Sequence, residues 1–156
     1  MRAELGLSGP TLLSVGLLIP RKGHDRIIAA LPDLPGCTLL VAGEGPDRAA
    51  LLALAARLGV AERVRLLGPQ PHAMLARLYA AADALVLASL REGWANVLLE
   101  AMACGTPVLA GPAWAQDKWA SRPIKLIVPY LAGTAPDTSA RTLADAMGPL
   151  LGQSIV

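Results

Sequence analysis

Hydrophobic residues are concentrated in five short runs that alternate with amphipathic segments. Each run carries few polar side chains, as in the stretch CTLLVA that ends at Ala42. A strand with one covered face alternates apolar and polar residues, whereas a strand covered by helices on both faces is apolar throughout. The pattern therefore predicts five buried strands in an α/β domain: Thr11–Gly16, Cys37–Ala42, Val64–Leu67, Ala84–Ala88 and Pro107–Ala110.

Helical patterns occupy the segments between these runs. Pro46 is expected at the first helical position of one of them, with Asp47 in its first turn and Gly59 ending it. The predicted helices are Asp25–Leu31, residues 45–58, His72–Ala81 and Ala95–Ala103. Repeated strand–helix units predict a Rossmann-like, doubly wound parallel sheet. Ligands bind such sheets beyond the carboxyl ends of the strands, which directs attention to loops 17–24, 43–46, 68–72, 89–95 and 111–123.

The same pattern continues to the end of the chain. Lys125–Val128 is expected to form a strand, and Asp137–Leu151 an amphipathic helix with Asp137 as its N-cap. A length of 156 residues suits one domain. We therefore expect residues 1–156 to form a single Rossmann-like domain, with the last strand added to the parallel sheet.

Composition narrows the class of protein. The chain is 54% hydrophobic with a mean hydropathy of +0.48, yet no apolar run approaches the roughly 20 residues of a membrane span. Net charge is +2, and the 14 Lys and Arg residues form no dense run, so a nucleic-acid partner has little support. The N-terminus lacks a signal-peptide pattern, which predicts a cytoplasmic location.

Cysteine and histidine give no sign of a metal centre. Cys37 and Cys104 have no second cysteine at C-x-x-C spacing, so we interpret them as small buried hydrophobic residues in a reducing compartment. His24 and His72 are far apart in sequence. We expect His24 to be an exposed loop residue, with a phosphate contact as the alternative.

Two glutamates stand out in the segment 92–108. Glu92 lies in the loop that leaves a predicted strand, and Glu100 lies on the helix that follows. The first backbone N–H groups of that helix form a potential anion site. A carboxylate on an otherwise apolar helix is costly unless it meets donors. Two sugar hydroxyls would supply donors for Glu100, and so would a neighbouring loop that it caps.

This segment, E-G-x-x-N-V-x-L-E-A-M-A-C-G-T-P-V, resembles the signature of family-4 retaining glycosyltransferases, in which seven residues separate two glutamates. The agreement covers about residues 11–111 in order. Further matching blocks are Ser14–Gly16 with Lys22-Gly23, Leu39–Pro46, Val64–Gly68 and Leu78–Asp83. The resemblance implies a GT-B half-domain that binds a nucleoside-diphosphate sugar without metal or other cofactor. It also implies that an N-terminal acceptor domain is missing.

The resemblance assigns roles to individual residues. Lys22 would contact the donor diphosphate, Glu100 the ribose hydroxyls and Glu92 the transferred sugar, which makes Lys22 and Glu92 the catalytic candidates. The remaining predicted donor-site residues are Gly16, Gly43, Glu44, Leu67, Gly93, Asn96 and Val97. Of these, Gly43, Glu44 and Leu67 would line the base pocket, and Gly93, Asn96 and Val97 would present backbone N–H groups. Leu17 replaces the arginine usual in the family, which predicts weaker donor binding unless Arg21 substitutes for it.

After Gly111 the sequence changes character. Residues 113–153 resemble the start of the periplasmic solute-binding proteins of tripartite tricarboxylate transporters, although Thr134 replaces one glycine of that family's loop. A join near residues 105–112 would make the chain a chimera. Three hypotheses therefore stand: a donor-binding domain, a chimeric folded scaffold with no activity, and a carboxylate-binding module based on the tail.

Overall fold

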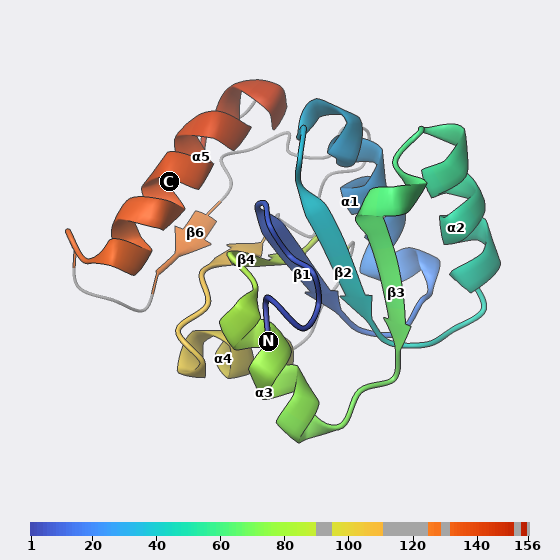
Figure 1. Ribbon diagram of the computed structural model, residues 1–156, viewed down its shortest axis with the longest axis horizontal. Helices are drawn as coiled ribbons and strands as arrows, with labels where there is room; N and C mark the ends of the chain where they lie inside the picture. Colours follow the sequence, from blue (N-terminus) through green and yellow to red (C-terminus); the bar gives the residue numbers. More distant parts are fainter. Residues whose placement is uncertain (90–94, 111–124, 129–131, 152–153, 156) are drawn as a thin grey trace.

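A computed structural model describes residues 1–89, 95–110, 125–128, 132–151 and 154–155 of the chain. Its centre is a six-stranded sheet in the order β3-β2-β1-β4-β5-β6 (Figure 1). The strands are β1 Thr11–Val15, β2 Thr38–Ala42, β3 Val64–Gly68, β4 Ala84–Leu87, β5 Val108–Ala110 and β6 Lys125–Ile127. β1 to β5 are mutually parallel, which confirms the predicted doubly wound α/β class.

Helices follow the strands as the sequence pattern predicts. The α-helices are α1 His24–Ala30, α2 Arg48–Arg57, α3 His72–Ala81, α4 Asn96–Ala103 and α5 Ala135–Leu151. Among the described residues, three short 3-10 helices lie between a strand and an α-helix: η1 Pro20–Lys22, η2 Leu31–Asp33 and η3 Ala61–Arg63. No helix in the described ranges is long and apolar enough to cross a membrane.

The sheet separates two hydrophobic cores, because successive residues of a strand point to opposite faces. Leu12 of β1 packs with Ile28 of α1 and Leu51 of α2, and Met147 of α5 joins the same core. Its neighbour Leu13 belongs to the opposite core, together with residues of α3 and α4. Helices pack on both faces of the sheet (Figure 1), which explains why the strands carry few polar side chains.

β6 joins the sheet at its edge and runs antiparallel to β5, a direction that the sequence pattern did not predict. Leu126 of β6 pairs with Leu109 of β5. A strand of only three residues has no side-chain pattern that specifies its direction, so only the pairing in the folded chain fixes the orientation of this strand.

Two helix starts also differ from the prediction. α2 begins at Arg48 rather than at residue 45, because residues 45–47 form a turn against the loop after β1: the Asp47 N–H donates to the Leu18 carbonyl oxygen at 3.1 Å. α5 begins at Ala135, so Asp137 lies in its first turn and is not the N-cap. The Asp137 Oδ2 instead accepts the Gly133 N–H at 2.8 Å and the Arg141 Nε–H at 2.9 Å.

Met147 provides a test of whether α5 is an integral part of the fold. Its side chain is 3% exposed in the core beneath α1 and α2, so Met147→Ala should lower the free energy of unfolding by about 2–5 kcal/mol. Ser139→Ala on the exposed side of α5 is the matched control and should change it little. Denaturant unfolding measures both. An unchanged main transition in Met147→Ala would mean that α5 does not belong to the cooperative unit.

Candidate functional site

The strand order places a topological switch point between β1 and β4. From β1 the chain continues through β2 to β3 on one side, whereas β4 continues to β5 on the other. α1 follows β1 and packs on one face of the sheet, and α4 follows β4 and packs on the opposite face. The two connections therefore diverge at the carboxyl ends of adjacent parallel strands, and this is where open α/β sheets bind ligands.

The loops that leave β1, β2 and β3 meet through their backbones. The Gly16 N–H donates to the Ala42 carbonyl oxygen at 3.0 Å, and the Gly43 N–H donates to the Gly68 carbonyl oxygen at 2.9 Å. A Cβ atom on Gly43 would lie 1.8 Å from the Gly16 carbonyl oxygen, so only glycine fits there. Gly16 and Gly43, both predicted donor-site residues, are thus in direct contact.

Lys22 lies at the end of η1, in the loop between β1 and α1. Its methylene carbons Cδ and Cε would be 3.4 Å from a Cβ on Gly16, so the lysine stem lies across that glycine. Gly23 packs against the loop after β4, because a Cβ on Gly23 would lie 2.2 Å from the Ala88 carbonyl oxygen. The structure therefore brings Lys22 together with Gly16 and holds its loop at the switch point.

His24 is buried, so the expectation of an exposed loop histidine is wrong. The ring is 2% exposed and lies within hydrogen-bond distance of Ser14 Oγ through Nδ1 (3.0 Å) and of the Leu17 carbonyl oxygen through Nε2 (3.2 Å). A carbonyl oxygen only accepts, so Nε2 carries the proton and Nδ1 accepts the Ser14 hydroxyl. His24 thus links the loop that carries Lys22 to the inside of β1.

Glu100 of α4 contacts a residue that the sequence did not single out. The Tyr79 hydroxyl, on α3, donates to Glu100 Oε2 at 2.9 Å. Burial, and next the hydrogen bond to Glu100, raise the pKa of Tyr79, which keeps the phenol protonated. The only sequence signal for this contact was that Tyr79 lies in one of the blocks quoted for the resemblance.

The remaining predicted site residues, as far as the structure describes them, lie on the same edge of the sheet. Glu44 is exposed, and its carbonyl oxygen accepts the Leu18 N–H at 2.9 Å. Leu67 is half-buried, and its carbonyl oxygen accepts the Gln70 Nε2–H at 2.8 Å, a cap that the sequence did not predict. Asn96 and Val97 form the first turn of α4. Glu92 and Gly93 lie outside the described residues.

Leu17, in place of the expected arginine, is an exposed hydrophobic residue in the loop after β1. Its side chain is 59% exposed, next to Leu18, which is fully buried. Arg21 on η1 is also exposed. The loop therefore presents Leu17, Arg21 and Lys22 at the carboxyl edge of the sheet, and whether Arg21 replaces the missing arginine stays a prediction.

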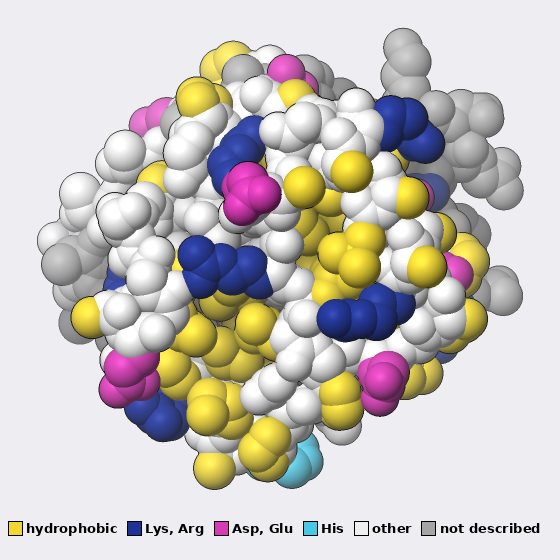
Figure 2. All heavy atoms as spheres, turned by 45° about the vertical axis from the view of Figure 1, so that its right-hand side comes forward, with side chains coloured by type: hydrophobic (Ala, Val, Ile, Leu, Met, Phe, Trp, Pro, Cys, Tyr) yellow, Lys and Arg dark blue, Asp and Glu magenta, His cyan; other side chains and the backbone are white. Residues whose placement is uncertain are grey.

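The described residues offer few other groups that could form a metal site, a reactive thiol or a basic patch. Among the described residues, no group of three or more His, Cys, Asp or Glu side chains is placed to hold a metal ion. Both cysteines are free thiols. Cys37 is buried and its burial raises its pKa to about 11, whereas Cys104 is half-buried rather than buried as expected. On the face drawn in Figure 2 the Lys and Arg side chains are dispersed, and some of them lie beside Asp or Glu side chains.

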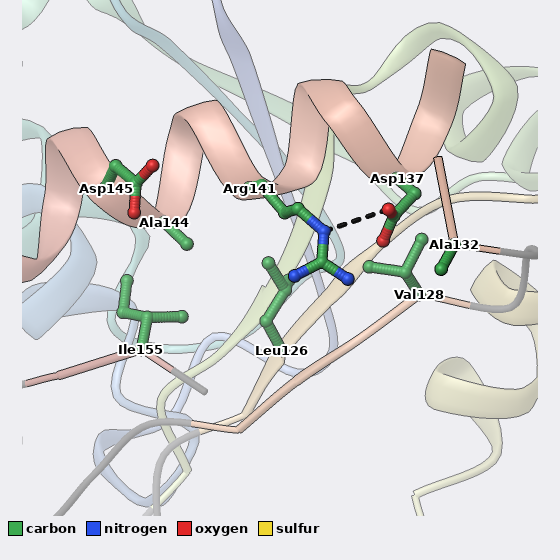
Figure 3. A pocket seen from close by; sticks show the side chains of 8 residues that line it. All are labelled: Leu126, Val128, Ala132, Asp137, Arg141, Ala144, Asp145 and Ile155. Atoms are coloured by element: carbon green, nitrogen blue, oxygen red, sulfur yellow. Dashed lines mark hydrogen bonds and ion pairs between the residues drawn. The ribbon is translucent and has the colours of Figure 1, made fainter. Parts of the chain in front are cut away.

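A cavity of about 450 Å³ lies between β6 and α5, away from the switch point (Figure 3). Arg141 points into it from α5 above Leu126 and is paired with Asp137, with Asp145 one helical turn further along. The N–H of Gly133, in the loop that the tail resemblance associates with a ligand carboxylate, is already bonded to Asp137. The carboxylate-binding hypothesis therefore gains no support from this loop.

The sheet and the helices on both of its faces define an α/β domain of the Rossmann-like, doubly wound class. The family described as glycosyl transferases group 1 matches residues 2–114, and the chain belongs to this family. A D-inositol 3-phosphate glycosyltransferase of Segniliparus rotundus is 44% identical over 119 residues, which cover 70% of this chain and 26% of that protein. The enzyme of the same name from Mycobacteroides abscessus is 35% identical over 158 residues, 96% of this chain and 34% of its own.

Solved structures agree with this assignment. Anabaena HepE in complex with UDP and glucose superposes with a TM-score of 0.65 at 31% identity, covering 70% of this chain and 31% of HepE. The fold is therefore that of one half of a GT-B glycosyltransferase. The chain spans about a quarter to a third of the length of these relatives.

His24 should make the stability of the fold depend on pH. Burial, followed by a smaller effect of the nearby Lys22 charge, lowers its pKa below the ordinary value of 6.5. His24 is therefore protonated more readily in the unfolded chain than in the folded chain. Its contribution to the free energy of unfolding is fully present above about pH 6.5 and is lost as the pH falls below that value. Urea unfolding between pH 7.5 and 5 should show this loss, and His24→Gln should reduce its slope.

The other histidine supplies the control. His72 is exposed at the start of α3, so His72→Gln should keep the wild-type pH dependence. Equal slopes for His24→Gln and wild type would show that His24 does not carry this proton linkage.

Proposed function

We propose that this chain is the donor domain of a retaining glycosyltransferase and binds a nucleoside-diphosphate sugar. The observation that carries the proposal is the position of the Lys22 loop and of the α4 N-terminus, which flank the switch point between β1 and β4. Each is a feature that attracts phosphate, and each follows the carboxyl end of one of these two adjacent strands, which supports the proposal.

The diphosphate is held by positive charge from two sources. Lys22 supplies a compact ammonium group, whose stem is guided over Gly16. The first backbone N–H groups of α4, at Asn96 and Val97, have no acceptors within the helix and carry the positive end of its dipole. In the transfer reaction this pair would stabilise the diphosphate as it leaves the sugar.

The nucleoside occupies the adjoining edge of the sheet. Glu100 accepts hydrogen bonds from the ribose hydroxyls, since a carboxylate offers about four acceptor positions and Tyr79 uses one. The base lies along Gly43, Glu44 and Leu67, beside the close backbone contact between Gly43 and Gly16 that requires glycine at position 43. Glu92 and Gly93 contact the transferred sugar by analogy with the family. UDP is the first nucleotide to test, because HepE binds it.

The acceptor is assigned to a domain outside these 156 residues. Relatives named as D-inositol 3-phosphate glycosyltransferases are about three to four times longer than the matched region, which leaves room for a second domain in them. We propose that the full reaction needs such a domain, that no resident cofactor takes part, and that the reaction takes place in the cytoplasm.

An inactive chimeric scaffold is the second candidate. The family match ends at residue 114, close to the predicted join at residues 105–112. The alignment with the Mycobacteroides abscessus enzyme, which spans 96% of the chain, favours a continuous glycosyltransferase sequence instead. The two candidates differ in one measurable property, which is nucleotide binding.

UDP should stabilise the fold. At 100 times its dissociation constant it adds about 2.7 kcal/mol of apparent stability and raises the melting temperature by several degrees. Glu100→Ala should remove most of the shift, whereas Lys22→Ala should weaken UDP binding more than uridine binding. Glu62→Ala, an exposed carboxylate on η3 at the amino edge of the sheet, is the control and should keep the full shift. If millimolar UDP leaves the melting curve of wild type unmoved, the inactive scaffold is the better account.

These 156 residues alone should transfer little or no sugar. The donor would be bound, but no second domain would orient an acceptor hydroxyl, and orientation contributes about 7–11 kcal/mol to such reactions. We expect no product above background when the purified chain is incubated with UDP-glucose and an inositol phosphate. Rapid turnover under these conditions would show that the chain carries its own acceptor site.

A further inference from the structure

The hydrogen bond between Tyr79 and Glu100 joins the two helices on one face of the sheet. Tyr79 lies near the end of α3 and is 1% exposed, whereas Glu100 lies in the middle of α4 and is only half-buried. The hydroxyl donates to Oε2 at 2.9 Å. A buried aromatic residue thus directs its one polar atom to a carboxylate that still reaches the surface.

Contacts of its ring and of its backbone hold Tyr79 in place, in addition to the hydrogen bond with Glu100. Its ring belongs to the core that also contains Leu13, Leu85 and Ala101. Its carbonyl oxygen accepts the hydroxyl of Thr106 at 2.8 Å, and Thr106 is itself 2% exposed, just after the turn that ends α4. The phenol oxygen therefore has little freedom, and its position is set by the core.

The direction of donation leaves part of the carboxylate available. Ionised Glu100 can only accept, so the phenol proton lies between the two oxygens. The Tyr79 hydroxyl occupies one acceptor position on Oε2, and this contact fixes the rotation of the carboxylate group. Oε1 then has a defined direction, whereas the carboxylate of an unrestrained glutamate on a half-exposed helix face would sample several rotamers.

We propose that Tyr79 is a positioning residue for ribose recognition: its hydroxyl holds Glu100 in the orientation that accepts the 2′- and 3′-hydroxyls of the donor nucleotide. The inference rests on the proposed function and adds to it the residue that sets the geometry of the ribose contact. Tyr79 itself does not touch the nucleotide, so removing its hydroxyl should change how well the site distinguishes sugars at that position.

A purely structural role makes a different prediction. If the bond only ties α3 to α4, its loss weakens every ligand equally, because the whole site loosens. If it positions Glu100, losing the bond lowers the affinity of only those ligands that carry ribose hydroxyls. The discriminating quantity is therefore the ratio of the affinity for UDP to that for 2′,3′-dideoxy-UDP.

Titration calorimetry of the full chain with both nucleotides provides the test. Wild type should bind UDP about tenfold or more tightly than dideoxy-UDP, since hydrogen bonds to a charged group are among the stronger ones. Tyr79→Phe keeps the packed ring and should reduce this ratio several-fold, with dideoxy-UDP affinity nearly unchanged. The matched control is Thr106→Val, which removes the side-chain hydrogen bond to the Tyr79 carbonyl oxygen without touching the carboxylate and should keep the wild-type ratio.

The outcomes separate the two proposals. A wild-type ratio in Tyr79→Phe overturns the positioning role while donor binding stands. A wild type that binds both nucleotides equally removes the ribose role of Glu100, and with it this inference, but not donor binding. A wild type that binds neither nucleotide refutes the proposed function and the inference together.

A second measurement needs no variant and covers the case in which Tyr79→Phe does not fold. The chain contains two tyrosines, so selective ¹³C labelling at the ring carbon that bears the hydroxyl gives two resonances. The Tyr79 resonance should shift when UDP binds and much less when dideoxy-UDP binds, because only ribose hydroxyls draw on the same carboxylate. Equal shifts with the two nucleotides would contradict the inference.

Discussion

Parallel pairing of β1 with β4 is the constraint from which the site follows. The two strands lie side by side, yet the chain leaves them for helices on opposite faces of the sheet. Open α/β sheets bind ligands where two such connections diverge, and the contact of Gly23 with the Ala88 carbonyl oxygen holds the Lys22 loop at this point. The Lys22 loop and the start of α4 each follow one of these strands, and the proposed diphosphate site rests on that arrangement.

Two buried side chains hold the groups that the proposed donor site uses. His24 connects Ser14 inside β1 with the Leu17 carbonyl oxygen and so holds the loop of Lys22. Tyr79 connects the core beneath α3 with Glu100. Burial keeps both groups neutral, lowering the pKa of His24 and raising that of Tyr79. Neutral buried groups can orient charged neighbours without adding charges of their own, which would be costly to desolvate.

The C-terminal part of the chain contributes to the fold more clearly than to the site. β6 extends the sheet beyond β5, and α5 places Met147 in the same core as α1 and α2. Its polar groups serve the helix itself: the Asp137 carboxylate satisfies the Gly133 N–H and pairs with Arg141, which keeps the pKa of Asp137 below its ordinary value. The Gly133 N–H, in the loop for which this segment resembles another family, is thus used in local capping in this fold.

The sequence by itself determined the α/β class, the order of strands and helices, and the family, because apolar runs and glycines record burial and backbone conformation locally. It also placed Lys22 and Gly43 in loops that leave the carboxyl ends of strands, and Glu100 on the helix that follows such a loop. Only the tertiary structure decided that β6 is antiparallel, that His24 is buried and that Tyr79 contacts Glu100. Each of these depends on a partner that is distant along the chain or on packing around the residue, and the local pattern of residues contains no information about either.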